Sequence, residues 1–414
     1  PPSNPRPRNG EKMPAASPPH PVSPHPMSNW TDLDREFIAN TYSRFPVEIV
    51  AGRGSLLYDA GGKEYIDLGS GIGVTAFGIG DPQWKAAVVA QLDAIQHTSN
   101  LYYTHPDARL AQLLCGRTGM RKVFFSNSGA EANECAIKVA RKYAAQKKGP
   151  QYSTIVTLVN SFHGRTLTTL AATGQDHFHQ LFQPLTPGFV HVPANDLPQL
   201  TAAAQSHPTA AIMLECIQGE GGVVPLDPDF VRGVADYAAA QDLPLIIDEV
   251  QTGNGRTGRL YAYMNYGIVP DIVSTAKGLG GGLPIGATLM GGKTAGVLGA
   301  GDHGSTFGGN PVCCAGAISI IERLDEAFLS SVSEKGEYIL GALRNAPGIE
   351  SVTGMGLMIG VKTARPAGEV VAECIRKGVL CLTAKDKVRL LPALNIPLPL
   401  LVRAIDILKA AAAG

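Results

Sequence analysis

The middle of the chain alternates between two hydrophobic periods. Short apolar runs rich in β-branched residues, such as Thr154–Val159 and Ala210–Leu214, predict buried strands, and Pro228–Gln241 has the three- and four-residue spacing of a helix. Further strands are expected at Lys122–Ser126, Leu243–Ile247, Asp271–Ala276 and Ile285–Gly291. This alternation predicts an α/β fold with a mostly parallel sheet covered on both faces.

The segments on either side have a different pattern. Asp32–Thr41 and Pro82–Gln96 are expected to be helical, with short strands between Val47 and Leu68. The composition changes again at Pro311. We therefore expect a large domain at residues 79–310 and a smaller α+β domain built from residues 29–78 and 311–414. Residues 1–28 hold ten of the 30 prolines, which predicts a disordered tail.

Two of the predicted strands end in residues of opposite charge. Asp248 follows the strand Leu243–Ile247, and Lys277 follows the strand Asp271–Ala276 and precedes several glycines. Ligands of open α/β sheets bind beyond the carboxyl ends of the strands. A structural ion pair is the ordinary explanation. However, a lysine among glycines suits a Schiff-base nucleophile, and an aspartate at a strand end suits a protonated ring nitrogen.

Other strand ends carry candidates for binding anions and rings. Ser128 and Glu131 have the spacing of a capping box, so the helix after them is either simply well capped or a phosphate site. Phe162 either belongs to the core or stacks on a flat ring, and Arg165 is a candidate carboxylate ligand. His163 is expected to have a structural role rather than a catalytic one. Glu215 ends another strand before a glycine-rich segment.

Composition narrows the function classes. Lysine plus arginine and aspartate plus glutamate each total 35, so no nucleic-acid footprint or basic membrane anchor is expected. No apolar run is long enough to predict a transmembrane helix. The seven cysteines are unpatterned, which suits a reducing cytoplasm, and no metal site is expected.

With these residues in view, the sequence resembles the class-III pyridoxal-phosphate (PLP) aminotransferases of fold type I, and within them the acetylornithine aminotransferase branch. Nine stretches carry the likeness in the same order, and the likeness runs from about Tyr42 to Leu408. The sequence departs from the family pattern at Ala393, where a second proline is usual. The nine stretches are Thr41–Val47, His97–Tyr102, Ser128–Glu134, Phe162–Thr166, Gly219–Gly222, Asp248–Gly258, Ala276–Gly282, His303–Asn310 and Arg389–Pro392.

The resemblance implies a role for each matched residue around the cofactor. Lys277 would hold PLP as a Schiff base and then move the proton, and Asp248 would pair with the ring nitrogen. The remaining cofactor contacts implied by the resemblance are Gly129, Ala130, Phe162, Glu249, Val250, Gln251 and Thr306, the last reaching the cofactor of a neighbouring subunit.

The resemblance also implies substrates and an assembly. Tyr42, Arg165, Glu220, Ser305 and Arg389 would contact the amino donor or 2-oxoglutarate and glutamate, in a homodimer with shared sites. N2-acetylornithine is the first choice of donor. A carrier-linked lysine, N-succinyl-diaminopimelate, ornithine and 4-aminobutyrate stay open, as do racemisation and decarboxylation on the same fold. A nucleotide-binding protein is the alternative from another class, but no Walker pattern supports it.

Overall fold

The computed structural model describes residues 30–414, in two compact units divided between Val47 and Glu48. The predicted disordered tail, residues 1–28, lies outside the described residues. In the first unit, helix α1 (Trp30–Phe37) ends earlier than the predicted Asp32–Thr41, and Arg44 forms an ion pair with Asp34 at 2.8 Å. The domain boundaries expected near residues 78 and 310 remain predictions.

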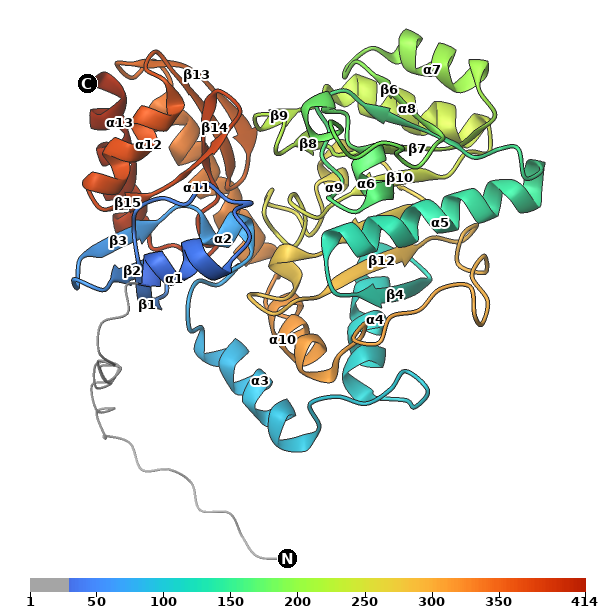
Figure 1. Cartoon of the computed structure of the whole chain (residues 1–414), viewed down its shortest axis with the longest axis horizontal. Helices are drawn as coiled ribbons and strands as arrows, with labels where there is room; N and C mark the ends of the chain where they lie inside the picture. Colours follow the sequence, from blue (N-terminus) through green and yellow to red (C-terminus); the bar gives the residue numbers. More distant parts are fainter. Residues whose placement is uncertain (1–29) are drawn as a thin grey trace, which may run out of the picture. The chain divides into compact units, whose positions relative to one another are not determined.

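A seven-stranded sheet forms the centre of the second unit (Figure 1). All neighbouring strands are parallel except β12, which runs antiparallel to both of its neighbours, so the predicted mostly parallel sheet is confirmed. The order across the sheet is β4 (Lys122–Ser126), β12 (Gly286–Met290), β11 (Ile272–Thr275), β10 (Leu245–Asp248), β7 (Thr209–Leu214), β5 (Thr154–Leu158) and β6 (Phe189–Val192).

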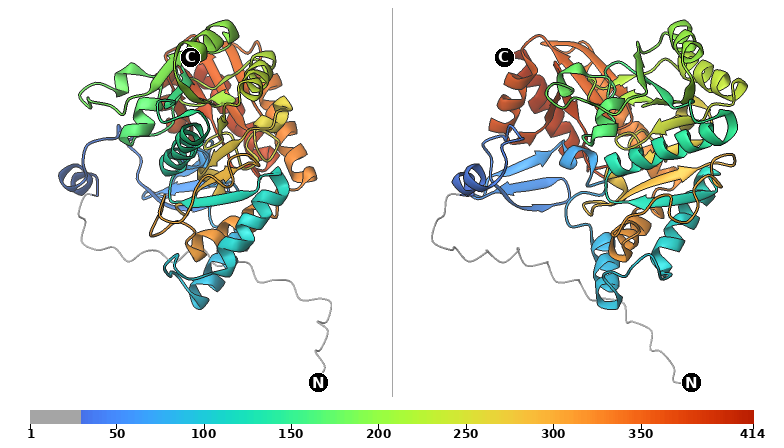
Figure 2. Two further views of the ribbon diagram at one scale, coloured as in Figure 1. Left: turned by 90° about the vertical axis from the view of Figure 1, so that its right-hand side faces the viewer. Right: turned by 45° about the vertical axis from the view of Figure 1, so that its right-hand side comes forward.

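Helices cover both faces of this sheet because its central strands are mostly apolar. Every residue of β5, β7, β10 and β11 is buried. Helix α5 (Gly129–Lys148) lies across β4, β12, β11 and β7, as the views in Figure 2 show. The remaining helices of this part are α3 (Pro82–Ala94), α4 (His105–Thr118), α6 (Leu167–Ala172), η1 (Asp176–Phe178), α7 (Leu197–Ser206), α8 (Pro228–Ala240), α9 (Tyr263–Tyr266), η2 (Lys277–Leu279) and α10 (Pro311–Ile321).

Smaller sheets join sequence-distant segments. Strand β15 (Val379–Leu380) pairs in parallel with β3 (Glu64–Asp67), which brings the segment after residue 48 beside the C-terminal part of the chain. The other elements are β1 (Ile49–Arg53), β2 (Leu56–Asp59), α2 (Ser70–Gly73), β8 (Ile217–Gln218), β9 (Val224–Pro225), α11 (Glu326–Leu343), β13 (Ile349–Met355), β14 (Met358–Thr363), α12 (Ala367–Arg376), β16 (Leu382–Ala384), β17 (Lys387–Leu390) and α13 (Leu398–Ala413).

Two helices were not expected from the sequence. The sequence pattern does not identify helices α4 and α7. Residues 97–105 have the sequence of an irregular loop whose aromatic side chains either pack within the chain or contact another subunit, and Tyr102 and Tyr103 are 70% and 105% exposed in the single chain. Within residues 30–414, no helix combines the length and the apolar character that crossing a membrane requires.

Candidate active site

Four strands bring chemically active side chains to one edge of the sheet. Asp248 ends β10, Glu215 follows β7, Lys277 follows β11, and the segment from Ser161 to Arg165 follows β5. These strands are parallel neighbours, so their carboxyl ends meet at the same edge. The structure therefore brings together the acid and the lysine that the sequence singled out.

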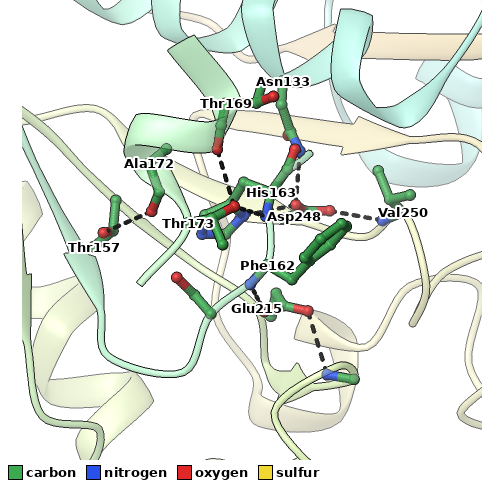
Figure 3. Close-up of polar contacts among 12 residues, drawn as sticks. Asn133, Thr157, Phe162, His163, Thr169, Ala172, Thr173, Glu215, Asp248 and Val250 are labelled. Carbon is green, nitrogen blue, oxygen red and sulfur yellow. Dashed lines mark hydrogen bonds and ion pairs between the residues drawn. The ribbon is translucent and has the colours of Figure 1, made fainter. Parts of the chain in front are cut away.

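Asp248 is the centre of a polar cluster, which we call the acid cluster: the buried residues Asp248, Asn133 and His163, and the backbone N–H of the partly buried Val250. Asp248 is 3% exposed. Its Oδ2 accepts from Asn133 Nδ2 at 2.7 Å and lies 2.8 Å from His163 Nδ1, while its Oδ1 accepts from Val250 N at 2.9 Å (Figure 3). Each carboxylate oxygen is thus fixed by neighbours, and the acid has one orientation.

Asn133 is a member of this cluster that sequence reasoning missed. It lies in the second turn of α5, is 1% exposed and also donates to the backbone oxygen of His163 at 2.8 Å. A polar side chain on the buried face of a helix was the available signal. His163, expected to be structural, contacts Asp248 directly, and its Nε2 has no hydrogen-bond partner in the described chain.

Lys277 has the properties of a reactive amine. It begins η2 with a φ of 46°, a left-handed conformation that is strained for lysine. Burial lowers the pKa of Lys277, and the nearby Arg389 guanidinium lowers it further, against the opposing charges of Glu220, Asp248 and Glu215. No hydrogen bond or ion pair joins its ammonium group to another residue of the range 30–414. The neutral amine is therefore more accessible here than in water.

The start of helix α5 is a candidate anion-binding site. Ser128 Oγ accepts from Glu131 N at 3.2 Å, which confirms the predicted cap. The first backbone N–H groups, at Gly129 and Ala130, have no acceptor within the helix and carry the positive end of its dipole. A Cβ on Gly129 would lie 2.5 Å from Val250 Cγ1, so only glycine lets this helix start approach Val250.

Arg165 lies among aromatic rings, in what we call the arginine cluster: Arg165, Phe162 and Phe178. Its guanidinium carbon is 3.9 Å from the Phe178 ring centroid and 5.4 Å from that of Phe162. Arg165 is exposed and has no hydrogen-bond or ion-pair partner among the described residues. Its N–H groups therefore remain free to bind a carboxylate. Phe178 was missed by sequence reasoning.

Arg389, unlike Arg165, is buried and hydrogen-bonded. It is 3% exposed in β17, and its Nη1 donates to Glu220 Oε1 at 2.5 Å and to Gln251 Oε1 at 3.1 Å. Burial raises the pKa of Glu220, but Arg389, Lys277 and Gln251 together lower it and leave this pKa below its usual value. The buried arginine thus has a carboxylate partner already in place.

The other predicted site residues lie in separate surroundings. Glu249 is fully buried, and its carboxylate accepts from Thr252 Oγ1 and Tyr263 N, so its cofactor contact stays a prediction. Tyr42 belongs to the first unit and is exposed. Ser305 and Thr306 line a cavity of about 550 Å³ whose lining includes neither Asp248 nor Lys277.

The chain is similar to known aminotransferases over most of its length. The chain is 51% identical to the acetylornithine aminotransferase of Haemophilus ducreyi over 378 residues, covering 91% of this chain and 96% of that protein. It is 43% identical to the acetylornithine aminotransferase of Methanocaldococcus jannaschii, covering 91% and 97%.

Solved structures of aminotransferases have the same fold as this chain. The Toxoplasma gondii ornithine aminotransferase, whose active site holds PLP at partial occupancy, superposes with a TM-score of 0.89 at 30% identity, covering 93% of this chain and 94% of that one. The Stenotrophomonas maltophilia N-acetylornithine aminotransferase gives 0.80 at 34% identity, covering 92% and 98%. Residues 37–412 match the family model for class-III aminotransferases, and the chain belongs to that family.

Proposed function

We propose that this protein is a PLP-dependent acetylornithine aminotransferase. It moves the ω-amino group of N2-acetyl-L-ornithine to 2-oxoglutarate and forms N-acetylglutamate semialdehyde and glutamate, a step of arginine biosynthesis. Relatives with that name are 43% to 51% identical over 91% of the chain. The observation that carries the proposal is the contrast between two arginines: Arg165 has no hydrogen-bond or ion-pair partner among the described residues, and Arg389, whose charge acts on Lys277, is paired with Glu220.

The residues present fit PLP. An unpartnered amine at Lys277 suits covalent attachment, and the open N–H groups at Gly129 and Ala130 suit a phosphate dianion. Asp248 suits a protonated ring nitrogen. Phe162 and Val250 would lie on the two ring faces, with Gln251 near the ring hydroxyl and Glu249 close by. When bound, PLP supplies an electron sink that stabilises the negative charge left on the substrate carbon.

Residues of the chain move the proton and hold the charge near the ring nitrogen. Lys277 Nζ, with its lowered pKa, takes the proton from the substrate carbon and returns it in the next step. Asp248 keeps its negative charge fixed towards the ring-nitrogen position, because Asn133, His163 and Val250 N hold its oxygens. These roles are the same for either substrate.

The two substrates differ in whether a carboxylate lies beside the reacting carbon, so the site must compensate the charge of Arg389 with one substrate and leave it available to the other. Arg165 binds the carboxylate distant from the reacting carbon in both substrates, and Ser305 adds contacts. Arg389 binds the near carboxylate of glutamate. The ω-amine has no carboxylate at that position, and an unpaired buried guanidinium is costly, so Glu220 neutralises Arg389 in that half-reaction.

We propose a cytoplasmic homodimer, in which Thr306 and Ser305 reach the neighbouring subunit's cofactor and substrate. The segment that adjoins their cavity supports this, because Leu101, Tyr102 and Tyr103 are at least 70% exposed in one chain. A monomeric mass in sedimentation equilibrium would contradict the shared site without affecting the donor assignment.

A panel of amino donors tests the proposed function. The purified protein should absorb near ~420 nm, as expected for the protonated Schiff base of PLP. With 2-oxoglutarate, N-acetylornithine should give the highest kcat/KM among ornithine, 4-aminobutyrate, N-succinyl-diaminopimelate and a carrier-linked lysine. A higher value for any other donor would overturn the donor assignment and leave the PLP assignment intact.

A further inference from the structure

Glu215 is a buried acid near the site to which none of the roles above assigns a part. It is 5% exposed and follows β7, which lies between β5 and β10 in the sheet. Its two oxygens bind two different segments. Oε2 accepts from Phe162 N at 3.0 Å, and Oε1 accepts from Gly219 N at 3.3 Å, as the dashed lines at Glu215 in Figure 3 show.

Each of these segments carries a different part of the site. Phe162 belongs to the arginine cluster and directly precedes His163, which contacts Asp248. Gly219 directly precedes Glu220, the partner of Arg389. One carboxylate therefore connects the segment beneath the cofactor ring position with the segment that carries Glu220.

The segment that carries Glu220 has little freedom to adjust. A Cβ on Gly219 would lie 2.5 Å from Gln251 Oε1, and one on Gly221 would lie 2.7 Å from Asn160 O. The loop around Glu220 is thus closely packed on both sides. Fixing the position of Gly219 therefore restricts where the Glu220 side chain begins, and Glu220 must leave Arg389 when glutamate binds.

We propose that Glu215 is a positioning residue that fixes Phe162 and Gly219 relative to each other and thereby sets the preference between N-acetylornithine and glutamate. The inference rests on the proposed function and names a further residue that governs its specificity. It predicts that weakening one of the two hydrogen bonds changes the balance of the two half-reactions as well as the local structure.

The charges around Glu215 make a neutral substitute reasonable. Burial raises the pKa of Glu215 to about 7; His163 and the two backbone donors lower it, and Asp248 raises it. Lys277 is the other charged group that interacts with Glu215. Because the neutral form is already accessible near pH 7, Glu215→Gln is expected to fold. The amide nitrogen cannot accept, so either Phe162 N or Gly219 N loses its acceptor.

Two measurements on the full-length, cofactor-loaded protein test the inference. Hydrogen exchange should become about tenfold faster at one of the two backbone N–H groups, as for loss of one buried hydrogen bond. Pre-steady-state rates should show a changed ratio of the glutamate to the N-acetylornithine half-reaction. Asp196→Asn is the control, because Asp196 Oδ1 accepts from Gln199 N at the start of α7 and asparagine retains that acceptor. It should leave both readouts unchanged.

The outcomes separate the inference from the proposed function. Faster exchange with a changed ratio supports the link. Unchanged exchange, or faster exchange with equal losses in both half-reactions, overturns it. If wild-type protein does not use N-acetylornithine, the donor assignment fails by itself, because wild type is measured first. Should Glu215→Gln not fold by circular dichroism, Glu215→Asp replaces it, since the shorter side chain reaches only one of the two N–H groups.

Discussion

The acid cluster and the arginine cluster share the segment Phe162–Arg165 but are constrained to very different degrees. Asp248 is 3% exposed and has three polar neighbours that fix both oxygens. Arg165 is exposed and contacts only ring faces. A buried hydrogen-bonded group has one favourable arrangement, whereas a cation over a ring can shift at little cost.

This difference matches what the two clusters would do. The chemistry assigned to Asp248 is identical for both substrates, so a fixed geometry is an advantage. Arg165 would bind a carboxylate at two different distances from the reacting carbon, so a movable guanidinium is an advantage. Arg389 lies between these cases, because it is buried but paired with a side chain that can leave it. If this is correct, substitutions of fixed residues should affect both substrates alike, and substitutions of movable residues should change substrate binding or selectivity.

The largest effect is expected for Lys277→Ala. Removing the amine should lower kcat by about a thousandfold or more, since it is proposed both to attach the cofactor and to move the proton. Lys293→Ala is the control, because Lys293 is a partly buried lysine that pairs with Asp271. Turnover is measured with N-acetylornithine and 2-oxoglutarate. Near-normal turnover of Lys277→Ala would remove Lys277 from the mechanism.

Asp248→Asn should have the next largest effect. It keeps the shape but places an amide where Asn133 and His163 meet a carboxylate oxygen, and it removes the charge proposed for the ring nitrogen. Single-turnover rates should fall by about 10²-fold or more with both donors alike. A loss confined to one donor would show that the acid cluster takes part in specificity, against the comparison drawn here.

Glu220→Ala should change selectivity more than overall rate. Without Glu220, Arg389 would be unpaired when the ω-amine binds, and glutamate would meet no competing carboxylate. The ratio of glutamate to N-acetylornithine half-reaction rates should rise by about tenfold, the effect of roughly 1.4 kcal/mol. An unchanged ratio would make the Glu220–Arg389 pair a permanent structural contact.

Phe178→Leu should have the smallest effect. Loss of the ring under Arg165 is expected to raise KM for both carboxylate substrates by about threefold to tenfold and to leave kcat nearly unchanged. Phe189→Leu is the matched control, because the Arg141 guanidinium lies 5.1 Å from the Phe189 ring. Phe178→Tyr should restore KM. A fall in kcat with constant KM would contradict a role limited to carboxylate binding.

The sequence predicted the parts of this site that depend on local pattern. Strand ends at Asp248 and Lys277 follow from apolar runs of the right length, and the Ser128 cap follows from its spacing to Glu131. These features need no knowledge of distant contacts, because strand and cap signals are local. The mostly parallel sheet followed from the alternation of such runs with helices.

The parts that depend on tertiary packing were not predictable in this way. Asn133 could be assigned only once it was known which face of α5 meets the sheet. Phe178 lies in a short 3-10 turn without periodicity. Helix α4 buries only Leu110 and Leu114, which is too weak an apolar pattern to identify. Tyr102 and Tyr103 are exposed in the single chain, so any partner for them lies outside what one sequence reveals.

The position of β12 has a consequence for the order in which the protein is made. Strand β4 lies at the edge of the sheet, and its sheet neighbour is β12, near residue 290. During synthesis on the ribosome, β4 and the start of α5 therefore emerge long before the strand that anchors them. The start of α5, proposed above to bind phosphate, therefore cannot reach its final packing until most of the chain has left the exit tunnel. Nascent chains ending before Gly286 should depend on chaperones to keep β4 from pairing with other molecules.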